Sequence, residues 1–273
     1  MLALFAVPAS AAVLFLLLPL AGLLYRAPWH GLGPLLTDPA LWQALKLSLL
    51  SSIIATGISL VLGVPLAFVL ARLSFPGRRL LRSLVLLPLV LPPVVGGVGL
   101  LYALGDGGLL GRPLAALGVS LPFTTAAVVV AETFVAMPFL VITVQGALSS
   151  SDARYEEAAA TLGATDWTTF RRVTLPLIAP SVAAGSVLTF ARALGEFGAT
   201  ITFAGNTAGR TRTMPLAVYN ALESDPPAAI ALSLVLLVVS IGILLGLREH
   251  WLRGGTLRDG TLRDGTLRGG TVR

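Results

Sequence analysis

Residues 149–176 read SSSDARYEEAAATLGATDWTTFRRVTLP, and their order of capping, acidic, small and basic residues predicts two short helices. Asp152 or a neighbouring serine can cap the first helix, because its side-chain oxygen can accept a hydrogen bond from a free backbone N–H. Glu156 and Glu157 favour the first turn of that helix, where the helix dipole is positive. Gly163 suits the position just after its end, which often needs a left-handed backbone.

The second helix of this stretch is expected to begin near Thr165 or Asp166, either of which can cap it. Pro176 is expected to end that helix and to start the next apolar run, because proline breaks a helix at the turn before it. The stretch therefore predicts a helical hairpin with a bend at Gly163. Small alanines on one face of the hairpin would let another surface approach closely.

Apolar runs long enough to cross a membrane flank this hairpin on both sides. The chain has 273 residues, of which 55% are hydrophobic and only 12% charged, whereas a soluble domain has about 25% charged residues. A spanning helix needs about 20 apolar residues. The runs that qualify are 1–25, 47–71, 83–105, 113–151, 173–191 and 226–247. The sequence predicts an all-α integral membrane protein with six transmembrane helices and no soluble catalytic domain.

Two of these runs have special features. The first could be a cleaved signal peptide, but it lacks a basic start and its apolar part exceeds an h-region, so a retained span is expected. The third contains the sequence LPLVLPPVVGG at 87–97. Its prolines and glycines remove hydrogen-bond donors and stiffness, which predicts a broken or kinked helix. Such a helix either packs tightly on its neighbours or lines a pathway.

Arginine is distributed unevenly over the loops between the runs. Short cytoplasmic loops are enriched in Lys and Arg, and alternate loops together with the C-terminal segment hold 13 arginines on one side, against five basic residues on the other. We therefore expect a multi-pass protein of the cell membrane, with both termini and the loop 149–175 in the cytoplasm. Residues 1–250 would form the transmembrane domain.

The C-terminal segment 251–273 is predicted to be a disordered, arginine-rich tail. From Gly255 it repeats GTLRD, GTLRD, GTLRG and GTVR, and a period of five fits neither a helix nor a strand. Its arginines could rest on anionic lipid, or the repeat could be an expansion without a role. Loss of transport after deletion of residues 255–273 would overturn the second interpretation.

Composition excludes several kinds of site. The chain has no cysteine, and its two histidines, His30 and His250, lie at the edges of predicted spans, so no metal site is expected. Lys46, the single lysine, follows Leu45 and therefore cannot belong to a phosphate-binding loop. If ATP drives this protein, another subunit binds it. The basic balance belongs to membrane loops and does not indicate a nucleic-acid partner.

The hairpin resembles the cytoplasmic signature of the permease subunits of ATP-binding-cassette importers. That signature is E-A-A, three residues, G, nine residues, then I-x-L-P, and this chain matches it in register with valine for isoleucine as the only departure. The matching residues are Glu157, Ala158, Ala159, Gly163, Val173, Leu175 and Pro176. In that family the loop is a coupling helix that docks on the ATPase. The alternative is a surface hairpin without a partner.

This resemblance implies the type I importer permease fold and a set of residues for ATPase coupling. The set comprises Glu156, Glu157, Ala158, Ala159, Gly163 and Pro176. It also implies a homodimer bound to two copies of a cytoplasmic ATPase, with ATP and Mg²⁺ held by the ATPase. This chain would then hold no cofactor and catalyse no covalent chemistry.

Further segments resemble the molybdate and sulfate branch of that family. They are FARALGEFGATITFAGN at 190–206, TRTMP at 211–215 and the proline-rich segment of the third run. The stretch LGEFGATITF, followed by TRTMP, is closer to molybdate permeases than to sulfate permeases, and the proline-rich segment agrees with the branch as a whole. The resemblance covers about residues 40–247 and implies import of molybdate delivered by an extracytoplasmic molybdate-binding protein. Sulfate, thiosulfate or tungstate is the alternative substrate.

Charged residues inside the predicted spans are candidates for the translocation pathway. Arg192 and Glu196 are four residues apart, so they can pair on one face of a helix. Arg192 could offer positive charge to an oxyanion while Glu196 keeps that charge from becoming a trap. Alternatively, the pair is structural and fixes the register of the helix. Glu132 has no partner that the sequence reveals, and we expect it near an interface or protonated.

The residues assigned to the pathway or gate surround this pair. They are Arg192, Gly195, Glu196, Phe197, Gly198 and Thr200, and the loop predicted to be external adds Arg210 and Arg212. The glycines remove bulk and so allow close approach of helices. A secondary transporter would usually show an internal repeat, and an intramembrane enzyme would need a catalytic constellation; neither feature is visible.

Overall fold

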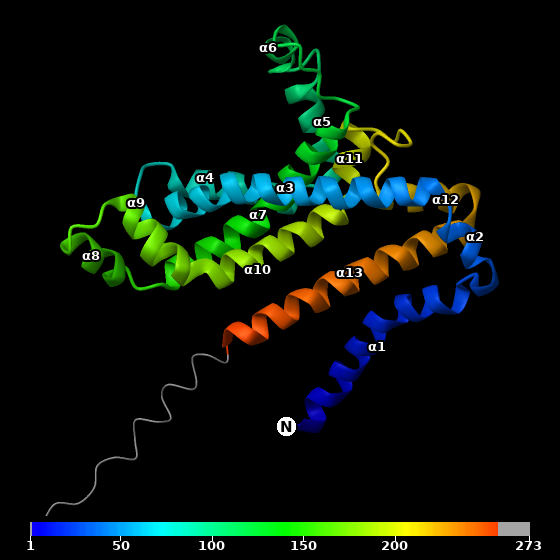
Figure 1. Cartoon of the computed structure of the whole chain (residues 1–273), viewed down its shortest axis with the longest axis horizontal. Helices are drawn as coiled ribbons and strands as arrows, with labels where there is room; N and C mark the ends of the chain where they lie inside the picture. The colour runs from blue at the N-terminus through cyan, green and yellow to red at the C-terminus, as the bar shows by residue number, and fades with distance from the viewer. Residues whose placement is uncertain (1, 256–273) are drawn as a thin grey trace, which may run out of the picture. The chain divides into compact units, whose positions relative to one another are not determined.

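The computed structural model describes residues 2–255, and over this range the chain folds into helices joined by short loops (Figure 1). The helices of the first half are α1 (Leu2–Arg26), the 3₁₀ turn η1 (Trp29–Gly31), α2 (Leu32–Leu36), α3 (Pro39–Arg72), α4 (Arg78–Val90), α5 (Pro93–Leu104), α6 (Gly111–Ala116) and α7 (Thr125–Ser150). Those of the second half are α8 (Arg154–Thr161), α9 (Asp166–Thr169), the π-helical turn η2 (Phe170–Thr174), α10 (Leu175–Leu194), α11 (Gly198–Phe203), α12 (Met214–Ser224) and α13 (Pro226–Gly255).

Five helices are long and apolar enough to cross a membrane, and a bent pair makes a sixth span. The bent pair is α4 and α5, which meet at an angle of 118°. The break falls where Pro92 and Pro93 follow Leu91, because the two prolines supply no backbone donors to continue the helix. The predicted six spans and the predicted break in the third span are confirmed.

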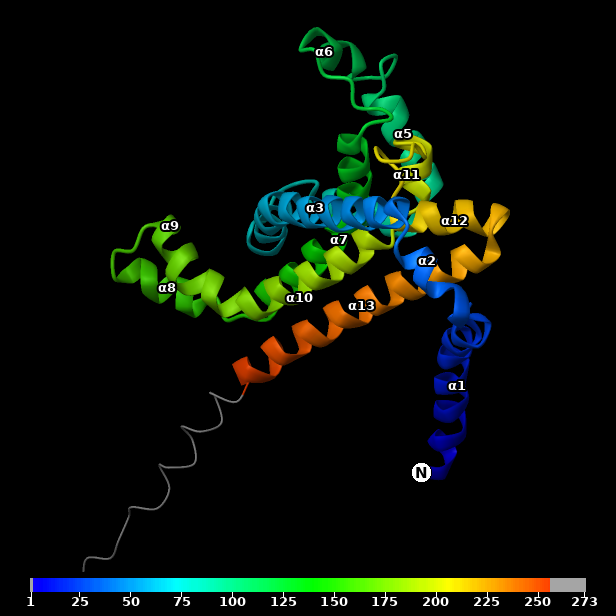
Figure 2. The same cartoon turned by 45° about the vertical axis from the view of Figure 1, so that its right-hand side comes forward.

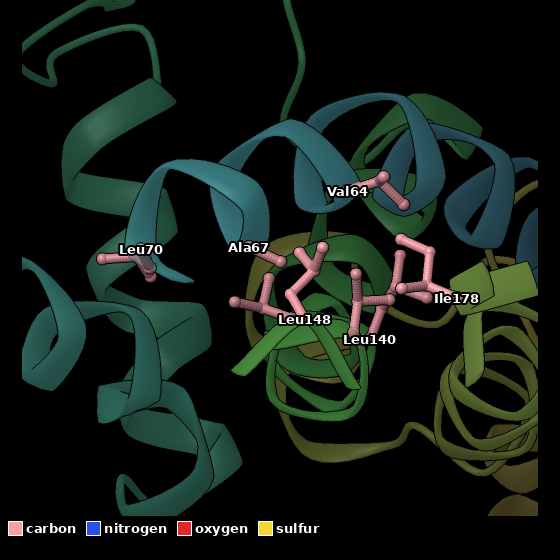
Figure 3. Packing of buried hydrophobic residues seen from close by; sticks show 8 residues of the cluster. Val64, Ala67, Leu70, Leu140, Leu148 and Ile178 are labelled. Carbon is pink, nitrogen blue, oxygen red and sulfur yellow. The ribbon is translucent and has the colours of Figure 1, made fainter. Parts of the chain in front are cut away.

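The core of the bundle is formed by α3, α7 and α10 (Figure 3). Val64 and Ala67 of α3 lie next to Leu140 and Leu148 of α7, and Ile178 of α10 lies beside Leu140. Leu70, at the end of α3, belongs to the same cluster of buried residues. Small residues bring the helices together. A Cβ on Gly185 of α10 would lie 2.9 Å from a methyl of Leu140, so only glycine fits there without a shift.

Helix α1 contributes nothing to this core. None of the span Phe5–Arg26 is buried, and large apolar side chains such as Leu14 and Phe15 are exposed along it. This pattern is expected where lipid is the solvent, because apolar side chains are then stable at the surface.

The contacts within the chain divide it into two units, residues 1–236 and 237–273, and the division lies within α13. The first unit contains the core, the loop 149–175, which is the predicted coupling loop, and the broken third span. The predicted disordered tail lies, from residue 256 onward, outside the described residues. The predicted domain boundary at residue 250 stays a prediction.

The predicted span over 113–151 is wrong at its start. Residues up to Ala116 form the short helix α6, and the spanning helix α7 begins only at Thr125. Its start is fixed by Thr124, whose hydroxyl accepts a hydrogen bond from Ala127 N at 3.2 Å. The apolar run is longer than the helix because apolar loop residues were counted with it.

Candidate functional site

The coupling loop has the local structure that its sequence predicts. Asp152 Oδ1 accepts a hydrogen bond from Arg154 N at 3.0 Å at the start of α8. Gly163 has a φ of +82°, a left-handed conformation that favours glycine. Around it Gly163 N donates to Ala160 O and Ala164 N to Ala159 O, which satisfies the last carbonyls of α8.

The second helix of the loop differs from the prediction at Pro176. Thr165 caps α9 as expected, through a hydrogen bond from Thr168 N at 3.3 Å. The helix does not end at Pro176, however, because α9, η2 and α10 form one continuous span, Asp166–Leu194. In η2 the bonding is shifted by one residue, with Leu175 N donating to Phe170 O, and proline at the next position has no donor that must be placed. The coupling loop is therefore joined directly to α10.

The hairpin α8–α9 presents an uncovered surface at one end of α3, α7 and α10 (Figure 2). Leu162 is 89% exposed and Trp167 is 67% exposed, and the matched residues Glu157 and Ala158 are also exposed. Trp167 stacks on Phe170, which in turn meets Phe68 of α3 edge-on. These ring contacts hold the exposed surface in place against the bundle.

Glu156 turns to a different side of α8 from the exposed Glu157 and is half-buried. Its Oε1 pairs with Arg72 Nη2 at 3.1 Å and accepts a hydrogen bond from Thr174 Oγ1 at 2.9 Å. Arg72 Nη2 also donates to Ser151 Oγ at 2.8 Å. The sequence signature pointed to Glu156 only as a neighbour of the matched residues, because its partners are far away in sequence.

The segment predicted to form the pathway contains a second break, which its sequence does not predict. Helix α10 ends at Leu194 and α11 starts at Gly198. Arg192 and Glu196 do pair, with Nη2 and Oε2 separated by 2.6 Å. They do not share one helix, because Glu196 lies in the break. Its Oε1 accepts a hydrogen bond from Ala199 N at 2.8 Å, so one carboxylate ties α10 to the start of α11.

Glycines hold α11 against α5, the second half of the broken third span (Figure 1). A Cβ on Gly97 would lie 2.6 Å from Ala199 O and would also overlap Thr202 Oγ1. A Cβ on Gly198 would lie 2.9 Å from Pro93 Cβ. The two breaks of the fold therefore meet at one interface, which depends on the absence of side chains.

The remaining pathway residues surround this interface. Phe197 contacts Tyr219 of α12, with ring centroids 5.2 Å apart. Thr200 is fully buried, and its hydroxyl has no hydrogen-bond partner among the described residues. Gly195 has open space around it, since a Cβ there would meet only Ala191 O at 3.6 Å. The structure thus brings the predicted pathway set together at one break.

Glu132 is buried where α7 packs on α3. Its Oε1 accepts a hydrogen bond from Ser51 Oγ at 2.8 Å, and 81 residues separate the two. Nearby Ser48 Oγ accepts from Met214 N at 2.7 Å, which joins α3 to α12. The partner of Glu132 could not be predicted from the sequence because it is a serine on another span. The expectation that Glu132 is protonated stays a prediction.

The loop predicted to be external lies at the other end of α3 from the coupling loop, since Met214 bonds Ser48 near one end and Glu156 pairs with Arg72 at the other. Arg212 Nε donates to Asn206 Oδ1 at 2.8 Å, and Arg210 is exposed while its carbonyl accepts from Thr125 Oγ1. Arg212 also lines a cavity of about 220 Å³ together with Asp38 and Asp225.

Comparisons with known sequences identify relatives over most of the chain. A family model described as binding-protein-dependent transport system inner membrane component matches residues 63–253. The molybdenum transport system permease protein of Mycobacterium bovis is 53% identical over 239 residues, which cover 88% of this chain and 90% of that protein. The protein of the same description in Escherichia coli K12 is 42% identical over 219 residues, covering 80% and 95%. The sulfate transport system permease protein of the same strain is 40% identical over 246 residues, covering 89% of each.

Solved structures share the fold. A chain of a bacterial ABC transporter involved in the import of alginate superposes with a TM-score of 0.70 at 21% identity, over 92% of this chain and 95% of that chain. A chain of the MetNI methionine ABC transporter gives a TM-score of 0.57 at 19% identity, over 78% and 94%. The predicted importer-permease fold and the predicted resemblance to the molybdate and sulfate branch are confirmed.

Proposed function

The chain belongs to the family of binding-protein-dependent transport system inner membrane components, and from this premise we propose that it is the permease subunit of an ATP-driven molybdate importer. It is a multi-pass membrane protein that forms the translocation pathway and catalyses no covalent step. The 53% identity to a molybdenum permease over 88% of the chain is the observation that carries the proposal.

We propose molybdate and not sulfate as the substrate because of the same sequence identity to a molybdenum permease. The two permeases of E. coli K12 differ little in their identity to this chain, at 42% and 40%, so the mycobacterial relative decides the substrate. Both anions are tetrahedral dianions, and the permease meets them only after the binding protein has selected one. Sulfate, thiosulfate and tungstate are the alternatives within the class, and a secondary transporter is the alternative outside it.

The break between α10 and α11 is the proposed gate. Arg192 has 28% of its side chain exposed while its partner Glu196 is 1% exposed, so the cation of this pair is the accessible member. A charged group inside a membrane usually faces the bundle interior or a water-filled path. An oxyanion that reaches the break would meet the guanidinium, whereas the carboxylate stays tied to Ala199. Gly195, Phe197, Gly198 and Thr200 would shape the opening.

The coupling loop is the proposed docking site for the ATPase. Its exposed residues, including Glu157 and Leu162, face away from the bundle, and α10 continues from the loop to the gate without interruption. A displacement of the loop would therefore reach Arg192 through one helix. The proposed assembly is a homodimer with two ATPase subunits on the cytoplasmic side, which hold ATP and Mg²⁺, and a binding protein outside that meets Arg210 and Arg212.

Uptake into proteoliposomes tests the proposal. The chain would be reconstituted with its candidate ATPase, with ATP inside and the candidate binding protein outside, and radiolabelled molybdate or sulfate would be added. We expect ATP-dependent uptake of molybdate that a tenfold excess of sulfate does not abolish. Uptake of sulfate alone would move the substrate but keep the class. ATP-independent uptake driven by an ion gradient would support the secondary transporter instead.

A further inference from the structure

Two adjacent glutamates on α8 have different surroundings. Consecutive residues of a helix point about 100° apart, and here Glu157 is exposed while Glu156 turns toward the bundle and is half-buried. The side chain of Glu156 is 21% exposed and that of its partner Arg72 is 18% exposed. The two acids therefore serve different neighbours, although they are next to each other in sequence.

The contacts of Glu156 reach the ends of three spans. Arg72 is the last residue of α3, and Thr174 is the last residue of the turn that leads into α10. Ser151, which binds the same guanidinium nitrogen, caps the end of α7. A single carboxylate oxygen thus joins the coupling helix to α3 and α10 directly and to α7 through Arg72.

Among these three spans, α3 depends on this joint most. The chain itself connects the hairpin to α7 on one side and to α10 on the other, whereas 84 residues separate Arg72 from Glu156. Among the side chains that the structure describes, the salt bridges are this pair and Arg192–Glu196. One pair therefore lies at the coupling loop and the other at the break between α10 and α11.

We propose that Glu156 is a positioning residue that transfers movement of the coupling helix to α3 through Arg72 and to α10 through Thr174, while Glu157 is left for the ATPase. This proposal rests on the proposed function. It divides the tasks of the two acids, with Glu157 holding the partner subunit and Glu156 passing its displacement to the spans. Charge-assisted hydrogen bonds are suited to this task because they are short, directional and stronger than neutral ones.

The geometry also allows the joint to be tested by charge exchange. Arg72→Glu places a carboxylate against Glu156, and Glu156→Arg places two guanidinium groups together, so each single change creates repulsion. In the double variant the pair is restored with its charges reversed. Thr174 can then accept from the arginine, and Ser151 can donate to the new carboxylate, since a hydroxyl does both.

The experiment measures molybdate transported per ATP hydrolysed in proteoliposomes that contain the full complex. Glu156→Gln is expected to lower this ratio at least about fivefold, the lower end of typical coupling between sites, while the ATPase still co-purifies. Each charge-reversed single variant should lower it further, and the double variant should recover most of it. Glu157→Gln is the matched comparison and should weaken co-purification of the ATPase much more than it lowers the ratio.

Other outcomes would overturn the proposal. An unchanged ratio in Glu156→Gln and Arg72→Glu would show that the joint transmits nothing. Equal losses in the two glutamine variants would remove the division of tasks, and a double variant as poor as the single ones would point to a merely structural role. Thr174→Val provides a milder change if the charge variants do not fold, and it should lower the ratio less than Glu156→Gln. Failure of the unmodified complex to transport molybdate would contradict the proposed function itself.

Discussion

The coupling loop and the break between α10 and α11 differ in how their polar side chains are satisfied. At the loop, Glu156, Arg72 and Thr174 bind one another at the edge of the bundle, although Arg72 Nε is buried without a hydrogen-bond partner among the described residues. Thr200 in α11, Thr189 within α10 and Thr213 just before α12 are buried, and their hydroxyls have no hydrogen-bond partner in the part of the chain that the structure describes. An unpaired buried hydroxyl costs about 1–3 kcal/mol.

The two regions therefore suit different roles. A joint that must pass on force is best made from groups that are already committed to one another. A segment that lets a polar anion cross is best lined by groups that the protein itself leaves free, since intramembrane polar groups usually mark a substrate path. Substitutions in the two regions test whether they differ in this way.

Gly97→Ala should have the largest effect. The new Cβ would lie 2.6 Å and 2.8 Å from backbone atoms of Ala199, so α5 and α11 must separate. We expect a loss of about 3 kcal/mol in stability and loss of transport. Gly99→Ala on the same helix is the control, because no atom lies within 4 Å of its Cβ. Thermal unfolding of the solubilised protein and molybdate uptake measure both, and equal behaviour of the two variants would contradict the close contact.

Glu196→Ala should come next. It removes the partner of Arg192 and the acceptor for Ala199 N, and we expect a loss of about 2 kcal/mol, since Arg192 is partly exposed and solvent weakens the pair. Glu196→Gln keeps an acceptor for Ala199 and should lose about half as much. Thermal unfolding and uptake distinguish a structural role of the Arg192–Glu196 pair from a role in handling the anion. A glutamine variant of normal stability with low uptake would favour Arg192 and Glu196 as groups that handle the anion.

Gly163→Ala tests the bend of the coupling loop. A φ of +82° costs a residue with a Cβ about 1 kcal/mol, so the end of α8 should loosen and the stimulation of the ATPase should fall. Gly146→Ala is the control, because Gly146 is helical and has open space around its Cβ. ATPase activity with loaded binding protein measures the effect. A loss of equal size in both variants would assign it to flexibility in general.

Glu132→Gln should have the smallest effect. The amide oxygen can still accept from Ser51 Oγ, so the contact between α7 and α3 survives, and we expect a change below about 1 kcal/mol with near-normal uptake. Ser51→Ala removes the donor and should cost more. If Glu132→Gln abolished uptake while thermal unfolding stayed normal, the carboxyl would belong to the transport pathway.

The sequence predicts well whatever depends on local residues. Gly163 bends the hairpin and Thr165 caps its second helix as expected, because a bend or a cap needs only a few neighbouring residues. The N-cap of α8 is Ala153, and Asp152 binds Arg154 N from the preceding position. Pro92 and Pro93 predict the break in the third span for the same reason. Arg192 and Glu196 pair as expected because they are only four residues apart.

Structural features that depend on residues far apart in the chain could not be predicted from the sequence. The break after Leu194 contains no proline, and Gly198 at its end packs closely on Pro93 from another span. A π-helical turn precedes Pro176 in the continuous helix, and no local residue pattern predicts that turn. Ser51 and Arg72, the partners of Glu132 and Glu156, lie about 80 residues away from them.

The central claim is that this chain couples ATP hydrolysis by a partner subunit to the movement of molybdate. The most direct test is the ATPase activity of the reconstituted complex with binding protein that is empty, loaded with molybdate or loaded with sulfate. We expect only the molybdate-loaded binding protein to stimulate the ATPase activity. Hydrolysis that no form of the binding protein stimulates would contradict it.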